Sequence, residues 1–255
     1  MSNVNTQAVS NHLIGKVAFV QGGSRGIGAA IAKRLAKDGA AVALTYASSP
    51  DKAKEVVTEI EAAGGRAIAI KADSSDANQL QAAVRLAADT YGKIDILVNN
   101  AGVLALGDVA TFSLEDLDRT LAVNVRSVFI ASQAVVPHMD KGGRIITIGS
   151  TNADRMPFAG GAAYAMSKSA IVGLTKGLAR DLGPLGITVN NIQPGPIDTE
   201  MNPADSDFAD SLIGLMAVGR YGQVEEIAGF TSYLAGPEAG YITGASLTID
   251  GGFGA

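Results

Sequence analysis

Short apolar runs alternate with longer segments of helical period from Gly15 onward. Nearly all of the short runs are apolar throughout, which is typical of strands that are covered on both faces. The pattern predicts seven strands, at Val17–Val20, Ala41–Thr45, Ala67–Ile70, Ile94–Val98, Arg144–Ile148, Ile187–Ile192 and Ser246–Ile249.

The segments between these runs place apolar residues every three or four positions, which predicts amphipathic helices. Gly39, Gly64 and Gly92 each follow such a segment, where a left-handed glycine commonly ends a helix. Alternating strands and helices with right-handed crossovers give an α/β fold, a doubly wound parallel seven-stranded sheet with helices on both faces. The predicted helices span about Ile27–Lys37, Asp51–Ala63, Asp76–Thr90, Leu114–Val136, Ala163–Leu182 and Val224–Leu234.

Composition changes this picture little. The 255 residues are 47% hydrophobic and show no shift that would mark a linker, so we predict a single domain over residues 13–255 behind a flexible tail, residues 1–12. That tail lacks the basic start and apolar centre of a signal peptide, and the chain has no cysteine, so we expect a cytoplasmic protein.

Charge and residue types exclude several classes of site. The net charge is −5 and no block of Lys or Arg stands out, which argues against nucleic acid or an anionic membrane as a partner. Without cysteine there is neither a disulfide framework nor a thiolate metal site, and His12 and His138 alone cannot build a zinc centre. We therefore predict no metal.

The first predicted strand runs directly into the loop Gly22–Gly28, which reads GGSRGIG. In doubly wound sheets ligands bind beyond the carboxyl ends of the strands, and glycines there allow a tight turn, a close approach to a pyrophosphate and close helix packing. Gly22, Gly26 and Gly28 have the spacing for these roles. The alternative is that the glycines only permit a turn.

Tyr164 and Lys168 lie four residues apart, which puts the phenol and the ammonium on one face of a helix. Lowering a tyrosine pKa from about 10 to near 7 requires about 4 kcal/mol. A cation at about 4 Å supplies energy of that order at an effective dielectric constant of about 20. The pair is therefore predicted to act as an acid–base couple; a buried tyrosine beside an unrelated solvated lysine is the alternative.

Further polar residues end two strands and interrupt one helix. Ser150 follows RIITIG, Asn99 to Gly102 follow DILV, and Asn124 lies in the middle of a predicted helix. Because Gly-x-Ser-x-Gly is not present around Ser150, we interpret this serine as a hydrogen-bond donor and not as a nucleophile. Each of these residues could equally be a turn residue or a satisfied core amide.

Taken in order, QGGSRGIG, NNAG, Asn124, Ser150, YAMSK and PGPIDT resemble the short-chain dehydrogenase/reductase superfamily over about residues 13–255, close to its bacterial ketoreductase and 3-oxoacyl-acyl-carrier-protein reductase-like branch. The resemblance implies a Rossmann-type fold, NAD(P)-dependent carbonyl reduction or alcohol oxidation, and a homotetramer. It implies a catalytic tetrad of Asn124, Ser150, Tyr164 and Lys168.

Two features depart from the family pattern. Gln21 stands where relatives most often have Thr, which puts the packing of the glycine turn in doubt. Ser150 and Tyr164 are fourteen residues apart where thirteen is usual, so the loop between them carries one extra residue. We expect the extra residue to alter the pocket wall near Asn152 and Ala153.

The roles implied by the resemblance follow the flow of charge in hydride transfer. Tyr164 donates the proton, Ser150 holds the carbonyl, Lys168 lowers the tyrosine pKa and binds the ribose, and Asn124 bends its helix and holds a water. Asp73 resembles the adenine contact, although it could equally cap the next helix in competition with Ser74 and Ser75. The predicted cofactor residues are Gly22, Ser24, Arg25, Gly26, Ile27, Gly28, Tyr46, Ser48, Asp73, Asn100, Ala101, Gly102, Tyr164, Lys168, Pro194, Gly195, Ile197 and Thr199.

The second predicted strand ends in LTYASS, with no acid from Leu44 to Ser49 to bind a ribose 2′-hydroxyl. Arg25 and Ser48 can instead bind a 2′-phosphate, because arginine suits such an oxyanion. We therefore favour NADPH (NADP+) as cofactor. NADH stays the alternative, with Arg25 as a solvated loop residue.

Residues 198–218 carry five acids and neither Lys nor Arg, and they read as a lid over an apolar carbonyl substrate. We expect Met201 and Leu215 to line the substrate pocket beside Asn152 and Ala153. Such a segment would repel an acidic carrier protein, which disfavours 3-oxoacyl-acyl-carrier-protein reduction. A catalytically silent nucleotide-binding regulator stays a further alternative, and an enoyl reductase is disfavoured because its Tyr and Lys usually lie more than four residues apart.

Overall fold

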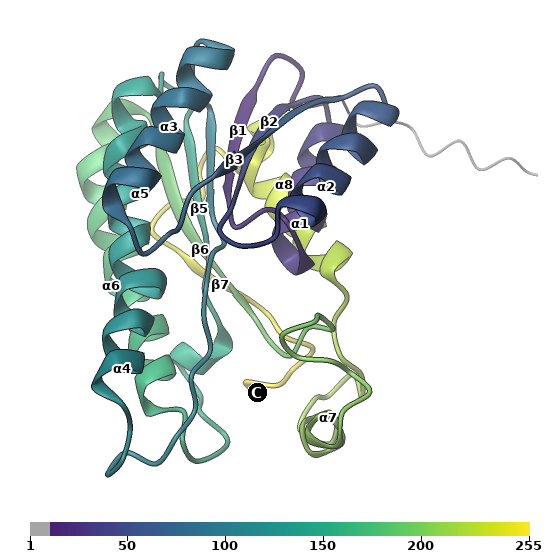
Figure 1. Cartoon of the computed structure of the whole chain (residues 1–255), viewed down its shortest axis with the longest axis vertical. Coiled ribbons are helices and arrows are strands. Elements are labelled where there is room, and N and C mark those ends of the chain that lie inside the picture. Colours follow the sequence, from purple (N-terminus) through teal and green to yellow (C-terminus); the bar gives the residue numbers. More distant parts are fainter. Residues whose placement is uncertain (1–10) are drawn as a thin grey trace, which may run out of the picture.

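The buried apolar runs form one parallel sheet. In a computed structural model that describes residues 11–255, seven strands pair in the order β3-β2-β1-β4-β5-β6-β7, which confirms the doubly wound α/β fold (Figure 1). The order reverses between β1 and β4, and this reversal opens a crevice at the carboxyl ends of the strands. The strands are β1 Val17–Gln21, β2 Ala41–Tyr46, β3 Arg66–Lys71, β4 Ile96–Asn99, β5 Arg144–Ile148, β6 Thr188–Pro194 and β7 Ser246–Ile249.

Helices cover both faces of this sheet, with α1, α2 and α8 on one side and α3, α5 and α6 on the other (Figure 1). As predicted, Gly39, Gly64 and Gly92 follow helices in left-handed conformation. The bounds are α1 Gly26–Lys37, α2 Pro50–Ala62, α3 Ala77–Tyr91, α4 Leu114–Leu121, α5 Ser127–Val135, α6 Ala162–Leu182, α7 Asp207–Ile213 and α8 Val224–Ala235.

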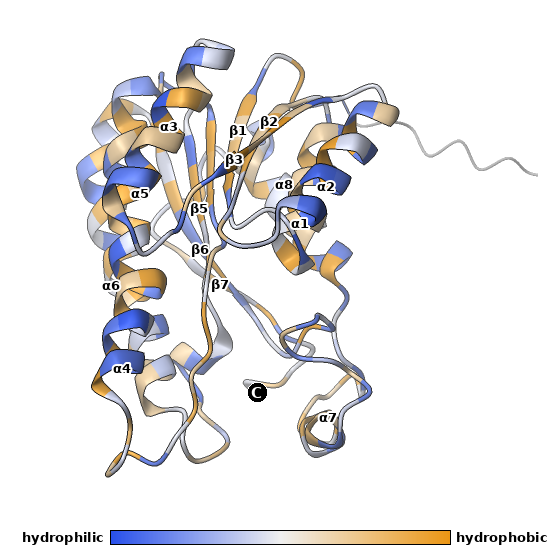
Figure 2. Cartoon of the chain, viewed as in Figure 1, coloured by the Kyte–Doolittle hydropathy of each residue, from blue (hydrophilic) through white to orange (hydrophobic). Residues whose placement is uncertain are grey.

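The sheet separates the core into two apolar layers. Successive strand residues point to opposite faces, so Val20 and Leu44 join the layer under α1 and α8, whereas Phe19 and Leu97 join the layer under α3 and α5. Hydrophobic residues accordingly make up much of the central strands, with hydrophilic residues toward their carboxyl ends (Figure 2). This two-sided burial explains why the strands read as continuous apolar runs.

The single long helix predicted over Leu114–Val136 is wrong in one respect. A π-helical segment, Ala122–Arg126, separates α4 from α5. The side chain of Asn124 lies in this segment, accepts a hydrogen bond from Val103 N at 2.9 Å and donates to Val103 O at 3.0 Å. An amide that binds backbone outside its own helix accounts for the local widening, because π segments are rare and need such compensation.

A row of polar residues crosses five neighbouring strands of the sheet, from the last residue of β1 to the first residue of β7. Gln21, Asn99, Thr147, Asn191 and Ser246 are register partners on five neighbouring strands. Asn99 donates to Thr147 and Asn191 donates to Ser246, at 3.4 and 3.1 Å, whereas neither polar atom of the buried Gln21 side chain has a hydrogen-bond partner in the described residues. The glycine turn is steadied instead by Thr45, whose Oγ1 accepts from Gly22 N at 3.0 Å.

Two further segments of the prediction are the lid and the N-terminal tail. The predicted lid, residues 198–218, contains the short helix α7, whose inner side packs Ala209 and Leu212 against Phe253 of the C-terminal tail. The predicted N-terminal tail lies outside the described residues except for Asn11 and His12, and the ring of His12 lies 3.3 Å from Ser232 O.

One helical stretch, Leu114–His138, is long and apolar enough to cross a membrane by length and composition. Its apolar residues include Val128, Ala131 and Val135, which are buried against the sheet or its covering helices. A helix that is buried in the core of a protein can meet the same criterion of length and composition.

Candidate active site

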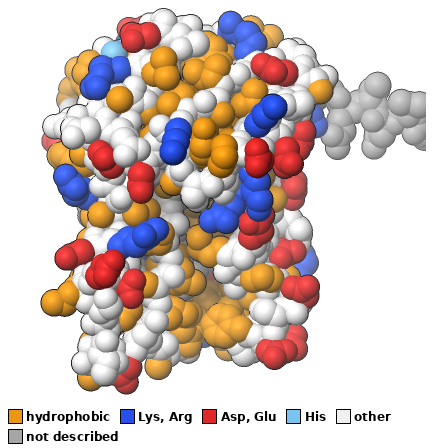
Figure 3. Space-filling model, in the orientation of Figure 1, with side chains coloured by type: hydrophobic (Ala, Val, Ile, Leu, Met, Phe, Trp, Pro, Cys, Tyr) orange, Lys and Arg blue, Asp and Glu red, His pale blue; other side chains and the backbone are white. Residues whose placement is uncertain are grey.

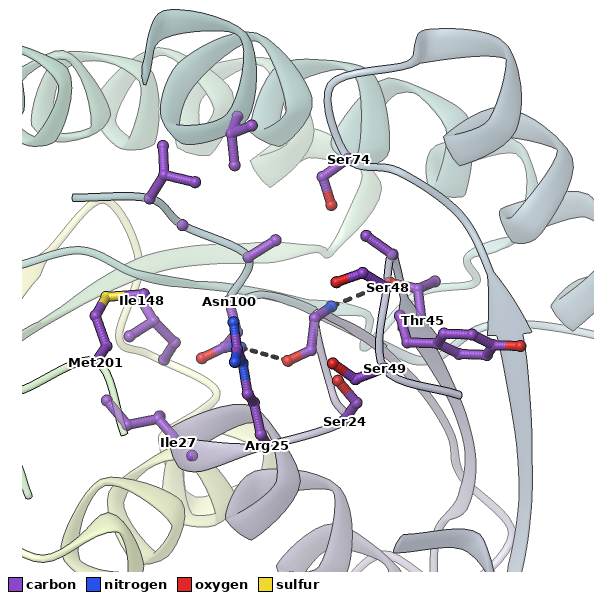
Figure 4. A pocket seen from close by; sticks show the side chains of 18 of the residues that line it. Ser24, Arg25, Ile27, Thr45, Ser48, Ser49, Ser74, Asn100, Ile148 and Met201 are labelled. Carbon is purple, nitrogen blue, oxygen red and sulfur yellow. Dashed lines mark hydrogen bonds between the residues drawn. The ribbon is translucent and has the colours of Figure 1, made fainter. Parts of the chain in front are cut away.

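A cavity of about 330 Å³ occupies the crevice between β1 and β4. It extends from the end of β2, where Ser48 and Ser49 line it, to the amino-terminal part of α6. Figure 4 shows Arg25 and Met201 at this cavity, with Ser24, Ser48 and Ser49 along one side. Figure 3 shows the surface in the view of Figure 1. In its lower half, hydrophobic side chains surround a hollow that lies between the parts of the surface formed around α4 and around α7.

The structure brings most of the predicted site residues to this cavity. Those that line it are Gly22, Ser24, Arg25, Gly26, Ile27, Tyr46, Ser48, Asp73, Asn100, Ala101, Gly102, Tyr164, Lys168, Thr199 and Met201. The predicted residues that do not are Gly28, Asn124, Ser150, Asn152, Ala153, Pro194, Gly195, Ile197 and Leu215.

The glycine loop is built by close contacts that exclude any side chain. Gly22 and Gly26 have φ of +69° and +53°, and a Cβ added to Gly28 would lie 2.2 Å from Gly22 O and 2.4 Å from Asn100 Nδ2. Asn100 Nδ2 donates to Gly22 O at 2.9 Å, which ties the loop to the end of β4. Gly28 therefore acts by packing behind the cavity wall.

Tyr164 and Lys168 lie on one face of α6 at the inner end of the cavity, as their spacing predicts. Lys168 Nζ lies 5.6 Å from the centre of the Tyr164 ring and donates to Ile148 O at 3.1 Å. The ammonium thus lies over the ring face, with a backbone carbonyl as its hydrogen-bond partner.

The pKa values in the described site differ from the sequence-based expectation. Burial raises the pKa of the Tyr164 hydroxyl, and the hydrogen bond with the Ser150 side chain lowers it only in part. Burial also lowers the pKa of Lys168 to about 8. The predicted depression of the tyrosine pKa by Lys168 is therefore not found here, because both groups lose hydration together.

Asn124 and Ser150 support this pair from behind. Asn124 Nδ2 donates to Ser167 Oγ at 3.0 Å, next to Lys168 in α6. A Cβ added to Gly102 would lie 3.6 Å from Asn124 Oδ1 and 3.7 Å from Lys168 Nζ. Because glycine has no side chain, the turn Asn99 to Gly102 can lie close to the side chains of Asn124 and Lys168. Ser150 Oγ accepts from Asn152 N at 3.1 Å, at the end of β5.

The substrate side is only partly as predicted. Met201 lines the cavity and is 57% exposed, whereas Leu215 lies outside it. Ala153 O accepts from Ser169 Oγ at 2.7 Å, which ties the loop after β5 to α6. The same loop meets the lid at Phe158, whose ring contacts Phe208 of α7 edge to face at 5.3 Å.

At the end of β6, Pro194 and Gly195 pack against other segments instead of lining the cavity. A Cβ on Gly195 would lie 2.7 Å from Asp250 Cβ, and Pro194 O accepts from Thr151 Oγ1 at 3.0 Å. The cap of α3 is Asp76, which accepts from Asn78 N and Gln79 N. The carboxylate of Asp73 binds Ser75, so the alternative role of Asp73 as helix cap is wrong.

Sequence reasoning missed several lining residues. Arg119 reaches the cavity from α4, and Glu200 from the start of the lid. Glu200 pairs with Arg25 and with Lys52 of α2. The sequence could have indicated Glu200 as a lining residue, because it follows the predicted cofactor residue Thr199. Its ion pair with Lys52, 148 residues away in the chain, leaves no pattern in the local sequence.

The cavity fits a dinucleotide. Its floor is a glycine turn whose backbone can approach a pyrophosphate, because Gly22 and Gly26 adopt conformations that side chains disfavour. It is followed directly by α1, whose first turn presents free N–H groups and carries no acid. Among the described residues there is no group of three or more His, Cys, Asp or Glu side chains that could hold a metal ion.

Comparisons with known proteins agree with this geometry. A family model described as enoyl-(acyl carrier protein) reductase matches residues 22–254. A relative from Escherichia coli (strain K12), named cyclic-di-GMP-binding biofilm dispersal mediator protein, is 50% identical over 241 residues, 94% of this chain and 98% of the relative.

Two solved structures are similar over nearly their whole length. A short-chain dehydrogenase/reductase from Serratia marcescens BCRC 10948 is 69% identical with a TM-score of 0.95, and the match covers 96% of this chain and 100% of that one. A short-chain dehydrogenase from Burkholderia cenocepacia J2315 in complex with NADP is 54% identical with a TM-score of 0.95 and the same coverage.

Replacing Gly28 by Ala tests the packing behind the cavity wall. The added methyl group would overlap Gly22 O and Asn100 Nδ2, so Gly28→Ala should lower the free energy of unfolding by about 1 to 3 kcal/mol in urea denaturation. The control Gly177→Ala adds a methyl group to α6 with no atom within 4 Å. Equal stability of the two variants would contradict the close contact.

Replacing Lys168 by Met tests the buried charge. A pKa lowered from 10.5 to about 8 means that folding opposes the charged form by about 3 kcal/mol. Lys168→Met should therefore raise the melting temperature at pH 7. The gain is full below the folded pKa of about 8 and shrinks as pH rises toward 10.5, where the unfolded lysine also loses its proton.

The exposed Lys176 on the same helix supplies the control. Lys176→Met should give no pH-dependent gain in calorimetric melting curves. A destabilised Lys168→Met variant, or a gain that is constant between about pH 7 and 9.5, would refute the account of the buried charge.

Proposed function

Because the chain belongs to the short-chain dehydrogenase/reductase family of oxidoreductases, we propose that it reduces a ketone or an aldehyde to the alcohol with NADPH, with Tyr164 as the proton donor. The observation that carries the proposal is the pairing of the half-buried Tyr164 with the buried Lys168, 5.6 Å from the ring centre, at the inner end of a cavity that fits a dinucleotide. The reverse reaction, oxidation of the alcohol, uses the same groups.

The nicotinamide ring, when bound, supplies the hydride that adds to the carbonyl carbon. The carbonyl oxygen then gains negative charge, and the Tyr164 hydroxyl gives it a proton so that the product is a neutral alcohol. Ser150, whose side chain hydrogen-bonds the Tyr164 hydroxyl, lies beside this proton donor and would hold the same carbonyl oxygen. Asn124 and Ser167 fix the helix that carries Lys168.

The pKa directions suit reduction at neutral pH. Burial keeps Tyr164 protonated, so the hydroxyl is ready to donate. A lysine with a pKa of about 8 exchanges its proton readily near neutral pH, so Lys168 can return a proton toward Tyr164 after each turnover. Lys168 Nζ, which lies next to the Gly102 turn, would hold the ribose of a bound cofactor.

NADPH is the proposed cofactor because the end of β2 offers hydroxyl groups and no acid. Ser48 and Ser49 line the cavity there, and Arg25 adds a positive charge. The Burkholderia cenocepacia relative, 54% identical, was solved with NADP. NADH stays the alternative.

The proposed substrate is a small or medium-sized apolar ketone, aldehyde or diketone. Met201 and the hydrophobic hollow beside the cavity suit an apolar group (Figure 3). Asp205, Asp207 and Asp210 on the lid give it a negative charge that would repel a carrier protein or a phosphorylated substrate. Reduction of a 3-oxoacyl chain on acyl carrier protein is therefore the less favoured reaction.

A nucleotide-binding regulator is the second candidate, and the name of the Escherichia coli relative, 50% identical, favours keeping it. A cavity that fits one dinucleotide offers contacts to another. The half-buried Tyr164 and the buried Lys168 weigh against this function, because binding alone needs neither group.

We also propose a homotetramer. Large apolar side chains are exposed on α5 and α6, where Phe129 and Met166 are 49% and 48% accessible. Tyr241, before β7, is fully accessible. Such groups are common at interfaces between subunits.

Tyr164→Phe tests the proposed proton donor. Loss of the hydroxyl should lower kcat for ketone reduction by about 10² to 10⁴ while NADP+ binding, measured by calorimetry, changes little. Tyr233→Phe on α8, far along the chain from the site, is the matched control. A Phe variant with full activity would rule out the mechanism, and NADP+ binding without turnover of any ketone in a broad panel would favour the regulator.

Arg25→Ala tests the cofactor choice. Removing a charged hydrogen bond should raise the KM for NADPH by about tenfold or more and leave the KM for NADH nearly unchanged. Arg85→Ala, on the outer part of α3, is the control for loss of one positive charge. Equal changes in the two KM values would remove Arg25 from 2′-phosphate recognition.

A further inference from the structure

One carboxylate at the rim of the cavity holds two cations. Glu200 Oε2 lies 3.4 Å from Arg25 Nη1, and Glu200 Oε1 accepts a hydrogen bond from Lys52 Nζ. The three side chains come from the segment after β6, the glycine loop and the first turn of α2. They are about half exposed, at 55%, 56% and 44%, so a solute anion can reach them.

The place that this carboxylate occupies is suited to an anion in general. It lies at the cavity wall that Ser48 and Ser49 also form. Ser49 precedes α2 without a side-chain cap, so the first N–H groups of that helix stay available. Lys52 binding lowers the pKa of Glu200, so the group there is a carboxylate at neutral pH.

We propose that Glu200 holds, in the free protein, the position that the 2′-phosphate of NADP(H) takes in the complex, and that the two anions exchange on Arg25 and Lys52. The inference rests on the proposed function, which requires that NADP(H) binds in this cavity. Lys52 thereby joins Arg25 as a specificity-determining residue, and Glu200 opposes the phosphate.

Charge decides between exchange and joint binding. Arg25 and Lys52 together carry two positive charges, and Glu200 cancels one of them. A phosphate monoester carries about 1.5 to 2 negative charges near pH 7. It therefore matches the two cations only when the carboxylate leaves, and a carboxylate that stayed would repel it at short range.

An exchange of anions at Arg25 and Lys52 can be distinguished by measurement from a general effect of the protein's net charge on ligand binding. Glu200 should act on the phosphate through Lys52 and Arg25, so its effect should depend on Lys52. An ADP ligand, which has no 2′-phosphate, should be nearly insensitive to both residues. The ratio of the affinities for adenosine 2′,5′-bisphosphate and for ADP therefore isolates the site.

The experiment is isothermal calorimetry of the full chain with these two ligands and with NADP+. Glu200→Gln should raise the affinity for adenosine 2′,5′-bisphosphate by about fivefold, the effect of one charge at about 4 Å in water. Lys52→Ala should lower it by a similar factor. The affinity for ADP should change less than twofold in either variant, and Glu200→Gln should have a smaller effect when Lys52 is already Ala.

Two matched controls separate the site from the net charge. Glu59→Gln removes the same charge from an exposed glutamate that pairs with Lys33, and Lys54→Ala removes an exposed lysine of the same helix. Both should leave the ratio of affinities unchanged.

An unchanged ratio in Glu200→Gln, or equal effects of Glu200→Gln and Glu59→Gln, overturns the exchange while leaving the proposed function intact, provided that the unmodified protein binds NADP+. Failure of the unmodified protein to bind NADP+ and adenosine 2′,5′-bisphosphate overturns the proposed function and this inference with it. A raised ratio that needs Lys52 supports both.

Discussion

The site depends on the hydrogen bond from Asn100 Nδ2 to Gly22 O, at 2.9 Å. It joins the ends of β1 and β4, the two strands between which the order of the sheet reverses. Because Gly28 packs against both partners of this bond, α1 can begin only directly behind the turn. The reversal of strand order opens the crevice, and this contact fixes the position of the glycine loop in it and the direction in which α1 presents its N–H groups.

A second constraint acts at the other end of the cavity. The proposed chemistry needs ionisable side chains there, and burial on folding disfavours their charged forms. Lys168 is 6% exposed, and its hydrogen bond to Ile148 O is that of an amine to a neutral carbonyl. The charged form is destabilised, which brings its pKa to about 8. The same burial keeps the Tyr164 hydroxyl protonated. The buried Lys168 therefore lowers the free energy of unfolding, and in return the site has groups that exchange protons near neutral pH.

The strands, most helices and the residues around the cavity could be predicted from the sequence, because each has a local cause. Val17 to Val20 read as a buried strand, Gly22 to Gly28 as a glycine-rich turn, and Tyr164 with Lys168 as one helix face. What failed depends on contacts between distant segments. Asn124 binds Val103 within a π-helical segment, where the sequence pattern predicted one helix over Leu114–Val136 and only the family resemblance implied a bend at Asn124.

The pairing of Glu200 with Arg25 and Lys52 likewise joins three separate segments, and the pKa of Tyr164 depends on how deeply α6 is buried. Gln21 stays without a functional account, since its side chain is fully buried and its polar atoms have no partner in the described residues.

The central claim, hydride transfer in this cavity, is tested most directly with NADPH carrying deuterium at both C4 positions and a panel of apolar ketones. The account predicts one deuterium on the carbinol carbon of the product, detected by mass spectrometry. Alcohol product without deuterium, or no product although NADP+ binds, would contradict it.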